Sequence, residues 1–389
     1  MTRNADSKTI TPVKVGLIGA GYIANWHAAA LKRVKNARLV AVSDRAPSAA
    51  EGFAAPRGLK TCASLGAMLA EVDCVHVLTP PAAHYGIARE VLDAGKHCFV
   101  EKPMTLDANE ARALGALAEA KGVALGVNHN FLMLPGYERL KADIANNVIG
   151  PVDTFAANWR YAFAPLRSGP YDIWMLREPQ NLLYEIGSHL FAFVADLLPE
   201  FKARDVYLRY PIEIPGGVTQ FQAWRISGLA DDSAATIDIS LIEGHDDRSI
   251  ELRGLGASAR FDFANDAYLL SRTPTGDIVA GPLATQLSLA GQAVRTGLAN
   301  AARQAVSLNE LAPYGLSIAR ACQSFYRSLA ADAPVDPRLS ADLAARSVAM
   351  MTEAAAIAAA QFRRRASVTA IGERLKPRML VIGGAGFIG

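Results

Sequence analysis

Hydrophobic and polar positions follow two different patterns along this chain, and the first covers residues 13 to about 130. Short apolar runs there end in turn residues, as buried strands do, and longer segments with one apolar face separate them. The expected strands are Val13–Ile18, Ala37–Val42, Cys74–Leu78, His97–Val100 and Val123–Val127; helices are expected from Tyr22 onward and over Ala46–Ala55, Ser64–Ala70, Ala83–Ala94 and Ala108–Lys121. Strands that alternate with helices form a parallel sheet with right-handed crossovers. This part is predicted to be an α/β domain.

The second pattern begins after Gly150-Pro151 and has a period of two. Five segments alternate apolar and polar residues: Val206–Tyr210, Gln220–Ile226, Ala234–Leu241, Ser249–Gly254 and Ala259–Phe263. A helix is expected near Leu182–Leu198, and Ala-rich helices from about Leu287 to Gln361. This predicts an α+β domain with a mostly antiparallel open sheet, one face of which is covered by helices. The expected organisation is a flexible tail (1–11), the α/β domain (12–130), the α+β domain (131–362), a linker (363–377) and a last segment (378–389).

Composition narrows the class of protein without naming its activity. The chain has 389 residues, of which 51% are hydrophobic, so two domains can each bury a core. The net charge of +3 comes from scattered Lys and Arg, which predicts neither a nucleic-acid nor a membrane partner. The four cysteines lack metal-ligand spacing, and no signal peptide is evident at the start. We expect reduced thiols, no metal and a cytoplasmic protein.

A glycine turn follows the first expected strand and predicts a dinucleotide site. Gly19 allows a tight reversal into a helix, and Gly21 lets a pyrophosphate approach the N–H groups at the helix start. Such a turn can also be purely structural. The second strand ends at Asp44, where a dinucleotide site places a carboxylate for the ribose 2′-hydroxyl. That carboxylate predicts NAD, whereas the neighbouring Arg45 leaves NADP possible.

Ligands of parallel sheets bind beyond the carboxyl ends of the strands, so further cofactor contacts are expected there. Gly19, Asp44, Thr79, Glu101, Lys102 and Asn128 all follow expected strands. The complete expected cofactor set adds Tyr22, Ile23, Arg45, Pro80 and His84. His84 is equally well explained as a polar residue at a helix N-terminus.

Several of these segments together resemble a known family. They are GAGYIA at 19–24, Asp44, Thr79 to His84, Glu101-Lys102-Pro103 and a later Glu185 to His189. In this order they resemble the glucose-fructose oxidoreductase / inositol dehydrogenase / rhizopine-catabolism (Gfo/Idh/MocA) family over residues 12–362. The resemblance implies a Rossmann domain, an α+β domain with an open sheet, and a homodimer or homotetramer assembled through that sheet. It also implies nicotinamide-dependent redox chemistry on sugars, cyclitols or sugar nucleotides.

The same residues suit hydride transfer from a secondary alcohol, which needs a base for the hydroxyl proton and a cation near the oxygen. Lys102 precedes a proline at a strand end, so its amine can point at the reacting oxygen. Glu185 and His189 are spaced i, i+4, and on a helix the carboxylate would orient the imidazole and stabilise its protonated form. We expect Lys102 and His189 to be catalytic and Glu185 to support them. Without the resemblance, His189 would be interpreted as a core histidine. A surface lysine in a strand-end turn is the alternative for Lys102, and the neighbouring Glu101 and Pro103 argue against it.

Substrate identity is the open part of this interpretation. Tyr161, Trp174 and Tyr184 are candidates for stacking on a sugar, although aromatic core positions explain them equally well. Glu185 stands where the family usually has aspartate, and Ala192 where a second aspartate often follows the histidine. The expected substrate is a sugar or sugar nucleotide. The alternative is a non-catalytic dinucleotide- or sugar-binding regulatory protein of the same fold.

The end of the chain carries a second glycine pattern. The apolar run Met379–Ile382 leads into Gly383 to Gly389 with G-x-x-G-x-x-G spacing, which resembles the opening of an NAD-dependent epimerase/dehydratase, an extended short-chain dehydrogenase. A glycine-rich tail is the alternative. A strand without its helix and neighbours cannot bury its faces, so residues 378–389 alone should bind nothing. We expect a bifunctional oxidoreductase–epimerase, which favours a sugar-nucleotide substrate.

Overall fold

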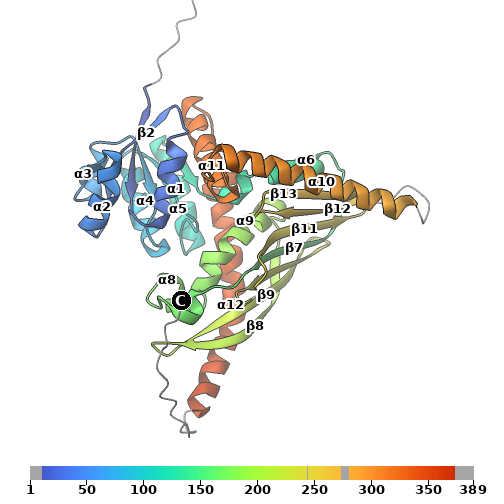
Figure 1. Cartoon of the computed structure of the whole chain (residues 1–389). Helices are drawn as coiled ribbons and strands as arrows, with labels where there is room; N and C mark the ends of the chain where they lie inside the picture. The colour runs from blue at the N-terminus through green and yellow to red at the C-terminus, as the bar shows by residue number, and fades with distance from the viewer. Residues whose placement is uncertain (1–10, 243, 273–279, 373–389) are drawn as a thin grey trace, which may run out of the picture.

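A computed structural model describes residues 11–242, 244–272 and 280–372, and gives side chains as far as 362 (Figure 1). The flexible tail expected at residues 1–11 lies outside this part except for Thr11, and so does the predicted epimerase-like segment 378–389.

The first domain contains a parallel sheet with strand order β3-β2-β1-β4-β5-β6. The strands are β1 (Val13–Ile18), β2 (Ala37–Ser43), β3 (Lys60–Thr61), β4 (Cys74–Val77), β5 (His97–Val100) and β6 (Leu125–Val127). The helices between them are α1 (Tyr22–Leu31), α2 (Pro47–Ala54), α3 (Leu65–Leu69), α4 (His84–Asp93) and α5 (Ala108–Lys121). The predicted α/β class is confirmed, and only the short edge strand β3 was not expected. The order reverses between β1 and β4, so their carboxyl ends flank the crevice where such sheets bind ligands.

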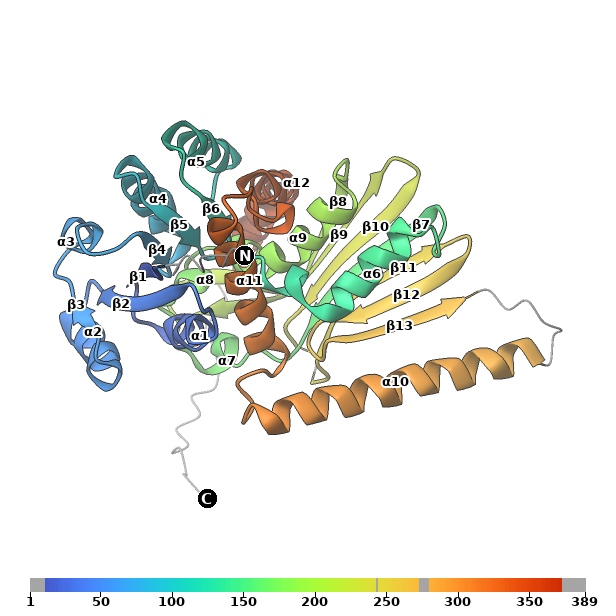
Figure 2. The same ribbon diagram turned by 90° about the horizontal axis from the view of Figure 1, so that it is seen from above.

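Two helices from the later part of the chain complete this domain. On one face of the sheet, α1 packs beside α11 (Pro313–Ala330), which contributes Cys322, Phe325 and Tyr326 to the core. On the other face, α4 and α5 pack with Ala344 and Ala345 from the start of α12 (Ala341–Gly372). The expected boundary at 130 assigned all of these later residues to the second domain. The structure differs because the apolar faces of α11 and of the start of α12 cover the first sheet (Figure 2).

The second domain is built on an open sheet with strand order β13-β12-β11-β7-β10-β9-β8. The strands are β7 (Val152–Arg160), β8 (Lys202–Ile214), β9 (Val218–Ala230), β10 (Ser233–Ser240), β11 (Asp247–Gly254), β12 (Ala257–Asp262) and β13 (Ala267–Arg272). Neighbouring strands are antiparallel except β7 and β10, which confirms the predicted mostly antiparallel sheet. One face is covered by α6 (Pro135–Ala145), α9 (Ser188–Leu197) and α12, whose apolar side chains share one core with the sheet (Figure 1).

The long helix α12 corrects one sequence expectation. It runs to Gly372, so residues 363–372, predicted to be part of a linker, are helical. Residues Ala341–Phe362 are long and apolar enough to cross a membrane by length and composition alone. Half of that window is buried inside the protein, as expected for a core helix packed between two domains.

Shorter elements connect these layers. They are η1 (Ala55–Arg57), η2 (Pro81–Ala83), η3 (Asn130–Met133), α7 (Pro165–Ser168), α8 (Trp174–Arg177), the π-helical turn η4 (Leu183–Gly187) and η5 (Pro337–Leu339). The remaining helix, α10 (Ala280–Val306), runs alongside the edge strand β13 (Figure 2).

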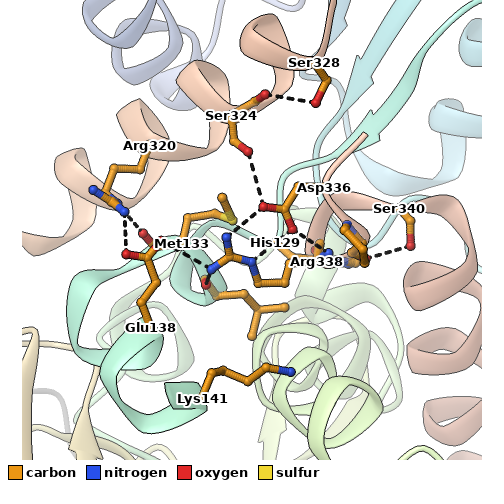
Figure 3. Close-up of polar contacts among 12 residues, drawn as sticks. His129, Met133, Glu138, Lys141, Arg320, Ser324, Ser328, Asp336, Arg338 and Ser340 are labelled. Atoms are coloured by element: carbon orange, nitrogen blue, oxygen red, sulfur yellow. Dashed lines mark hydrogen bonds and ion pairs between the residues drawn. The ribbon is translucent and has the colours of Figure 1, made fainter. Parts of the chain in front are cut away.

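A polar network fastens the junction between the domains (Figure 3). The Arg338 guanidinium is held by Asp336 and donates to the backbone carbonyl of Leu132 in η3. Arg320 of α11 donates to the Met133 carbonyl and to Glu138 of α6, at 2.6 Å in both cases. These bonds tie η3, which directly follows β6, to the C-terminal helices.

Candidate active site

The glycine turn is shaped to accept a ligand at the start of α1. Gly19 has φ of +101°, and a Cβ atom there would lie 2.7 Å from the backbone oxygen of Leu78. Gly21 is the N-cap of α1, no side chain caps the helix, and a Cβ at Gly21 would have no neighbour within 4 Å. Gly19 is therefore required by the close approach of β1 and β4. Gly21 leaves open space in front of the helix N–H groups, where a phosphate is favoured.

Asp44 connects this turn to the end of β2. Its Oδ2 accepts from the Ala20 N–H and its Oδ1 from the Ala46 N–H, both at 2.8 Å. A carboxylate oxygen has a second lone pair, so each can still accept a ribose hydroxyl. Arg45 and Tyr22 are exposed nearby, and Ile23 is partly buried. The carboxylate therefore fixes the turn as well as being available to a cofactor.

Two buried polar atoms at the strand ends have no hydrogen-bond partner within the described ranges. They are Oγ1 of Thr79, after β4, and Oδ1 of Asn128, after β6. Buried polar atoms are normally satisfied, because leaving one unpaired costs about 1–3 kcal/mol. The polar groups of a dinucleotide bound along this edge fit that requirement. We therefore regard these residues as suited to hold NAD, together with Gly19, Gly21 and Asp44.

His84 has a different position from the one expected of a cofactor contact. It is buried, with Nδ1 2.8 Å from the Pro103 carbonyl oxygen and Nε2 2.7 Å from that of Thr79. Both ring nitrogens are thus occupied by backbone groups. His84 fastens the turn after β4 to the turn after β5, and it orients residues that can contact a cofactor. The adjacent Pro80 is exposed.

Glu101 lies at the centre of a buried hydrogen-bond chain. Its Oε1 accepts from Asn128 Nδ2 at 2.6 Å and lies 2.8 Å from His27 Nε2. The other nitrogen of His27 contacts His76 Nδ1 at 2.9 Å, and His76 Nε2 contacts the Tyr326 hydroxyl at 2.9 Å. Burial opposes ionisation of Glu101, but the hydrogen bond and charge of His27 and the charge of Lys102 lower its pKa overall. Glu101 is thus a buried anion beside the expected catalytic lysine.

Lys102 contacts a residue of the second domain. Its Nζ lies 2.7 Å from Glu185 Oε1 and 3.2 Å from the Glu185 backbone oxygen. The exposed fractions of the two side chains are 10% and 27%. The ammonium form of Lys102 is therefore bound by a carboxylate that replaces much of its water. The expectation that Glu185 orients His189 is not supported by this geometry, because the carboxylate binds Lys102.

His189 is held by aromatic rings. Its imidazole stacks on Trp159 with centroids 5.1 Å apart and planes 10° apart, and Phe131 meets it edge-on. Within the described residues, neither ring nitrogen has a hydrogen-bond partner. Burial, followed by the positive charge of Lys102, holds the pKa of His189 well below its usual value. His189 is thus neutral at pH 7 rather than the protonated imidazole that the sequence suggested, and a nitrogen is free to take a proton.

The three aromatic candidates for sugar stacking are not equivalent. Tyr161 is partly exposed near Trp159, and burial raises its pKa to about 12. Trp174 is partly buried at the start of α8, where its carbonyl accepts from Asn181. Tyr184 is buried, and its hydroxyl lies 3.2 Å from Thr352 Oγ1 in α12, so it packs in the core. Tyr161 is the best placed of the three to contact a ligand.

Sequence reasoning missed residues that contribute to the site through others. A series of hydrogen bonds links Glu101 to His27, His76 and Tyr326. Trp159 stacks on His189. His76 had a visible signal, because it is a polar residue in the middle of an apolar strand. The other three carried no comparable signal.

Comparisons with known proteins support an NAD-binding Rossmann fold in the first domain. Residues 13–129 match the Gfo/Idh/MocA family model, described as "Oxidoreductase family, NAD-binding Rossmann fold". The chain is 34% identical over 129 residues to the UDP-N-acetylglucosamine 3-dehydrogenase of Acidithiobacillus ferrooxidans, covering 33% of this chain and 41% of that protein. It is also 34% identical over 195 residues to the glucose-6-phosphate 3-dehydrogenase of Bacillus subtilis, covering 48% and 55%. The chain thus spans about half the length of the curated relatives it matches.

One solved structure extends the likeness in fold to the second domain. The WlbA dehydrogenase from Bordetella pertussis, in complex with NADH and UDP-GlcNAcA, superimposes with a TM-score of 0.71. The superposition covers 90% of this chain and 96% of that one at 18% identity. This shows that the two-domain architecture is shared, with a Rossmann domain followed by a mixed-sheet domain.

Proposed function

We propose that this chain, whose residues 13–129 form the NAD-binding Rossmann domain of the Gfo/Idh/MocA oxidoreductases, is an NAD(H)-dependent dehydrogenase or reductase. The reaction is hydride transfer between nicotinamide and a secondary alcohol or ketone of a sugar or sugar nucleotide. The observation that carries the proposal is the ion pair of Lys102, which lies beyond the carboxyl end of β5, with Glu185 of the second domain at 2.7 Å. Burial, followed by the positive charge of Lys102, lowers the pKa of His189.

Lys102 and His189 have different roles at the reacting oxygen. The Lys102 ammonium, oriented by Glu185, donates a hydrogen bond to that oxygen and stabilises the negative charge that grows on it during oxidation. His189, which is neutral, accepts the hydroxyl proton as general base. Bound NAD supplies the hydride acceptor. Thr79, Asn128 and the Gly19–Gly21 turn hold and orient it against the substrate.

The proposed substrate class is a sugar or sugar nucleotide. Curated relatives of this chain include enzymes named for UDP-N-acetylglucosamine, a sugar nucleotide, and for glucose 6-phosphate, a sugar phosphate. Tyr161, partly exposed beside Trp159, is a surface on which a sugar ring can stack. We propose a homo-oligomer in a cytoplasmic setting, consistent with four cysteines that are all free and buried.

The experiment that tests this function has two stages. Mass spectrometry of the purified protein identifies any retained nucleotide, for which NAD or NADH is expected. A panel of UDP-hexoses, UDP-N-acetylhexosamines, hexose phosphates, free sugars and cyclitols is then followed at the NADH absorbance. Reduction of NAD by at least one member supports the proposal. Tight binding of NAD with no turnover by any member would favour a regulatory protein instead.

We also propose, from the sequence of residues 378–389 alone, that the activity is fused to an NAD-dependent epimerase/dehydratase domain. Sequencing of the encoding reading frame decides this point. A frame that continues into strand and helix patterns after Gly389 supports the fusion, and a stop codon directly after it removes the idea.

A further inference from the structure

Helix α10 turns its apolar side away from the protein. Four large side chains on one side of it are mostly exposed, namely Leu283 (62%), Leu287 (66%), Val294 (62%) and Leu298 (68%), and so is its last residue, Val306 (88%). The opposite side of the helix makes polar contacts with the edge of the second sheet. Gln292 binds both the N–H and the carbonyl of Leu270 in β13, and Arg303 pairs with Asp266. A surface helix normally buries its apolar stripe against the core, so this orientation is inverted.

Seven exposed apolar residues of α10 form one continuous stripe. Its members are Leu283, Leu287, Ala290, Val294, Leu298, Ala301 and Ala305, all of which are exposed. Their spacing follows an 11-residue period, since Leu287 and Leu298, or Leu283 and Val294, are eleven positions apart. Such a period is close to that of a straight α-helix, so the stripe stays on one side along the whole helix. The only charged residues of α10, Arg295 and Arg303, lie off the stripe.

The stripe is symmetric about Val294. Leu283 and Ala305 lie eleven residues to either side of it, Leu287 and Ala301 seven, and Ala290 and Leu298 four. When two copies of α10 meet antiparallel with Val294 facing Val294, each leucine therefore faces an alanine of the other copy. Large residues opposite small ones fill space without overlap, as close packing requires.

Two glycines have the same symmetry. Gly291 and Gly297 lie three residues before and after Val294, and a Cβ atom at either would have no neighbour within 4 Å. They flank the central contact and let two helix backbones approach closely. No charge of either sign lies on the stripe itself, so the central contact between two identical copies is apolar.

We propose that α10 is a self-association surface that takes a second copy of this chain in an antiparallel, two-fold arrangement. A two-fold interface uses the same patch on both subunits, which is what a stripe symmetric about one residue provides. A helix of this length, about 40 Å, that buries one apolar side buries on the order of 1,000 Å² over both copies, the lower end of specific interfaces. This contact lies on a helix beside the sheet edge and not on the open sheet face, and it does not depend on the proposed catalytic function.

A matched pair of valine substitutions tests the contact. Val294→Lys puts a charge at the two-fold axis, whereas Val306→Lys makes the same change on the same helix at a position that is 88% exposed and off the stripe. Sedimentation velocity of the full chain, from low to high micromolar, should show a mass for Val294→Lys half that of the wild type at equal concentration. Val306→Lys should retain the wild-type mass. Circular dichroism confirms that both variants are folded.

Disulfide trapping tests the direction of pairing. Under mild oxidation Val294→Cys should cross-link with its own copy, because the four native cysteines are buried and do not compete. Leu283→Cys alone should not, because it faces Ala305, but the double variant Leu283→Cys/Ala305→Cys should.

Three results would overturn the proposal. One is an unchanged mass for Val294→Lys, and another is cross-linking of Leu283→Cys as efficient as that of Val294→Cys. The third is a wild-type chain that stays monomeric over the whole concentration range. If that monomer also sediments with phosphatidylserine-containing vesicles, the stripe contacts a membrane and not a second copy.

Discussion

The Nζ atom of Lys102 lies 2.7 Å from Oε1 of Glu185, although the two residues belong to different domains. Lys102 lies two residues beyond the end of β5 at Val100, and Glu185 lies in the π-helical turn Leu183–Gly187 that precedes α9. A π-turn carries an extra residue and changes the direction of the side chains it holds. The turn thus presents Glu185 to the lysine instead of to His189, one turn further on.

Glu185→Gln should lower turnover without removing it. The amide keeps the size of the side chain but not the charge that orients the Lys102 ammonium, and misplacement of a reacting group can cost up to about 10²-fold. The expected loss is therefore smaller than for Lys102→Ala, with NAD affinity unchanged. Steady-state kinetics check this, with the exposed Glu200→Gln as control. Wild-type turnover in Glu185→Gln would show that the ion pair has no part in catalysis.

Two glycine variants should separate cofactor binding from stability. Gly21→Ala places a methyl group in the open space before α1 and should weaken NAD binding while the unfolding temperature stays close to wild type. Gly19→Ala should also destabilise the fold by about 1–3 kcal/mol, since φ is +101° and the methyl would meet the Leu78 oxygen. NADH fluorescence titration and thermal unfolding provide the two readouts. Equal NAD affinity in Gly21→Ala and wild type would place the pyrophosphate elsewhere.

Asp44 should determine the choice between NAD and NADP. Its carboxylate lies at the end of β2 and would repel a 2′-phosphate, so wild type should bind NAD more tightly. Asp44→Ser should narrow or reverse this preference, helped by the exposed Arg45 beside it. Competition titrations with NADH and NADPH measure the ratio. A wild-type protein that prefers NADPH would contradict the role assigned to this carboxylate.

Acid should destabilise the fold partly through His129. Burial lowers the pKa of His129 to about 4, compared with about 6.5 in the unfolded chain, although the hydrogen bond to the Arg338 carbonyl acts in the opposite direction. The unfolded state then binds the proton more tightly than the folded state. The contribution of His129 to the free energy of unfolding is therefore complete above pH 6.5 and is lost as the pH falls toward 4. Two and a half pKa units correspond to about 3 kcal/mol.

His129→Asn provides the comparison for that pH dependence, because asparagine retains a donor for the Arg338 carbonyl but does not titrate. Urea unfolding between pH 7 and pH 4 should show a smaller loss of unfolding free energy in the variant than in wild type. Identical pH dependence of the two proteins would mean that His129 titrates normally in the folded state.

The sequence predicted the parts of this protein that depend on local patterns. Strand β5 and helix α5 have the predicted bounds, since Asp107 caps the N-terminus of α5 and Gly122 ends it with φ of +62°. The placement of α11 could not be predicted, because an apolar helix face does not specify which of two sheets it covers. The extent of α12 was missed because charged residues such as Arg363 suit an exposed helix end as well as a linker.

Within the site, the residues at strand ends could be predicted from the sequence, but their hydrogen-bond and ion-pair partners could not. The edge that carries Gly19, Asp44, Thr79 and Lys102 follows from strand order alone. The pairing of Glu185 with Lys102 depends on a π-turn that leaves no signature in an i, i+4 pattern. The series of hydrogen bonds from Tyr326 to Glu101 joins residues that are far apart in the sequence, and only the packed structure brings them together.

Turnover by Lys102→Ala and His189→Ala tests the central claim most directly. With a substrate from the sugar panel, single-turnover formation of NADH is compared in wild type, both variants and the exposed control His245→Ala. The account predicts a loss of about 10²–10⁴-fold in each active-site variant, the usual contribution of acid–base groups, with NAD affinity and the control unchanged. Wild-type rates of NADH formation in Lys102→Ala or His189→Ala would contradict it.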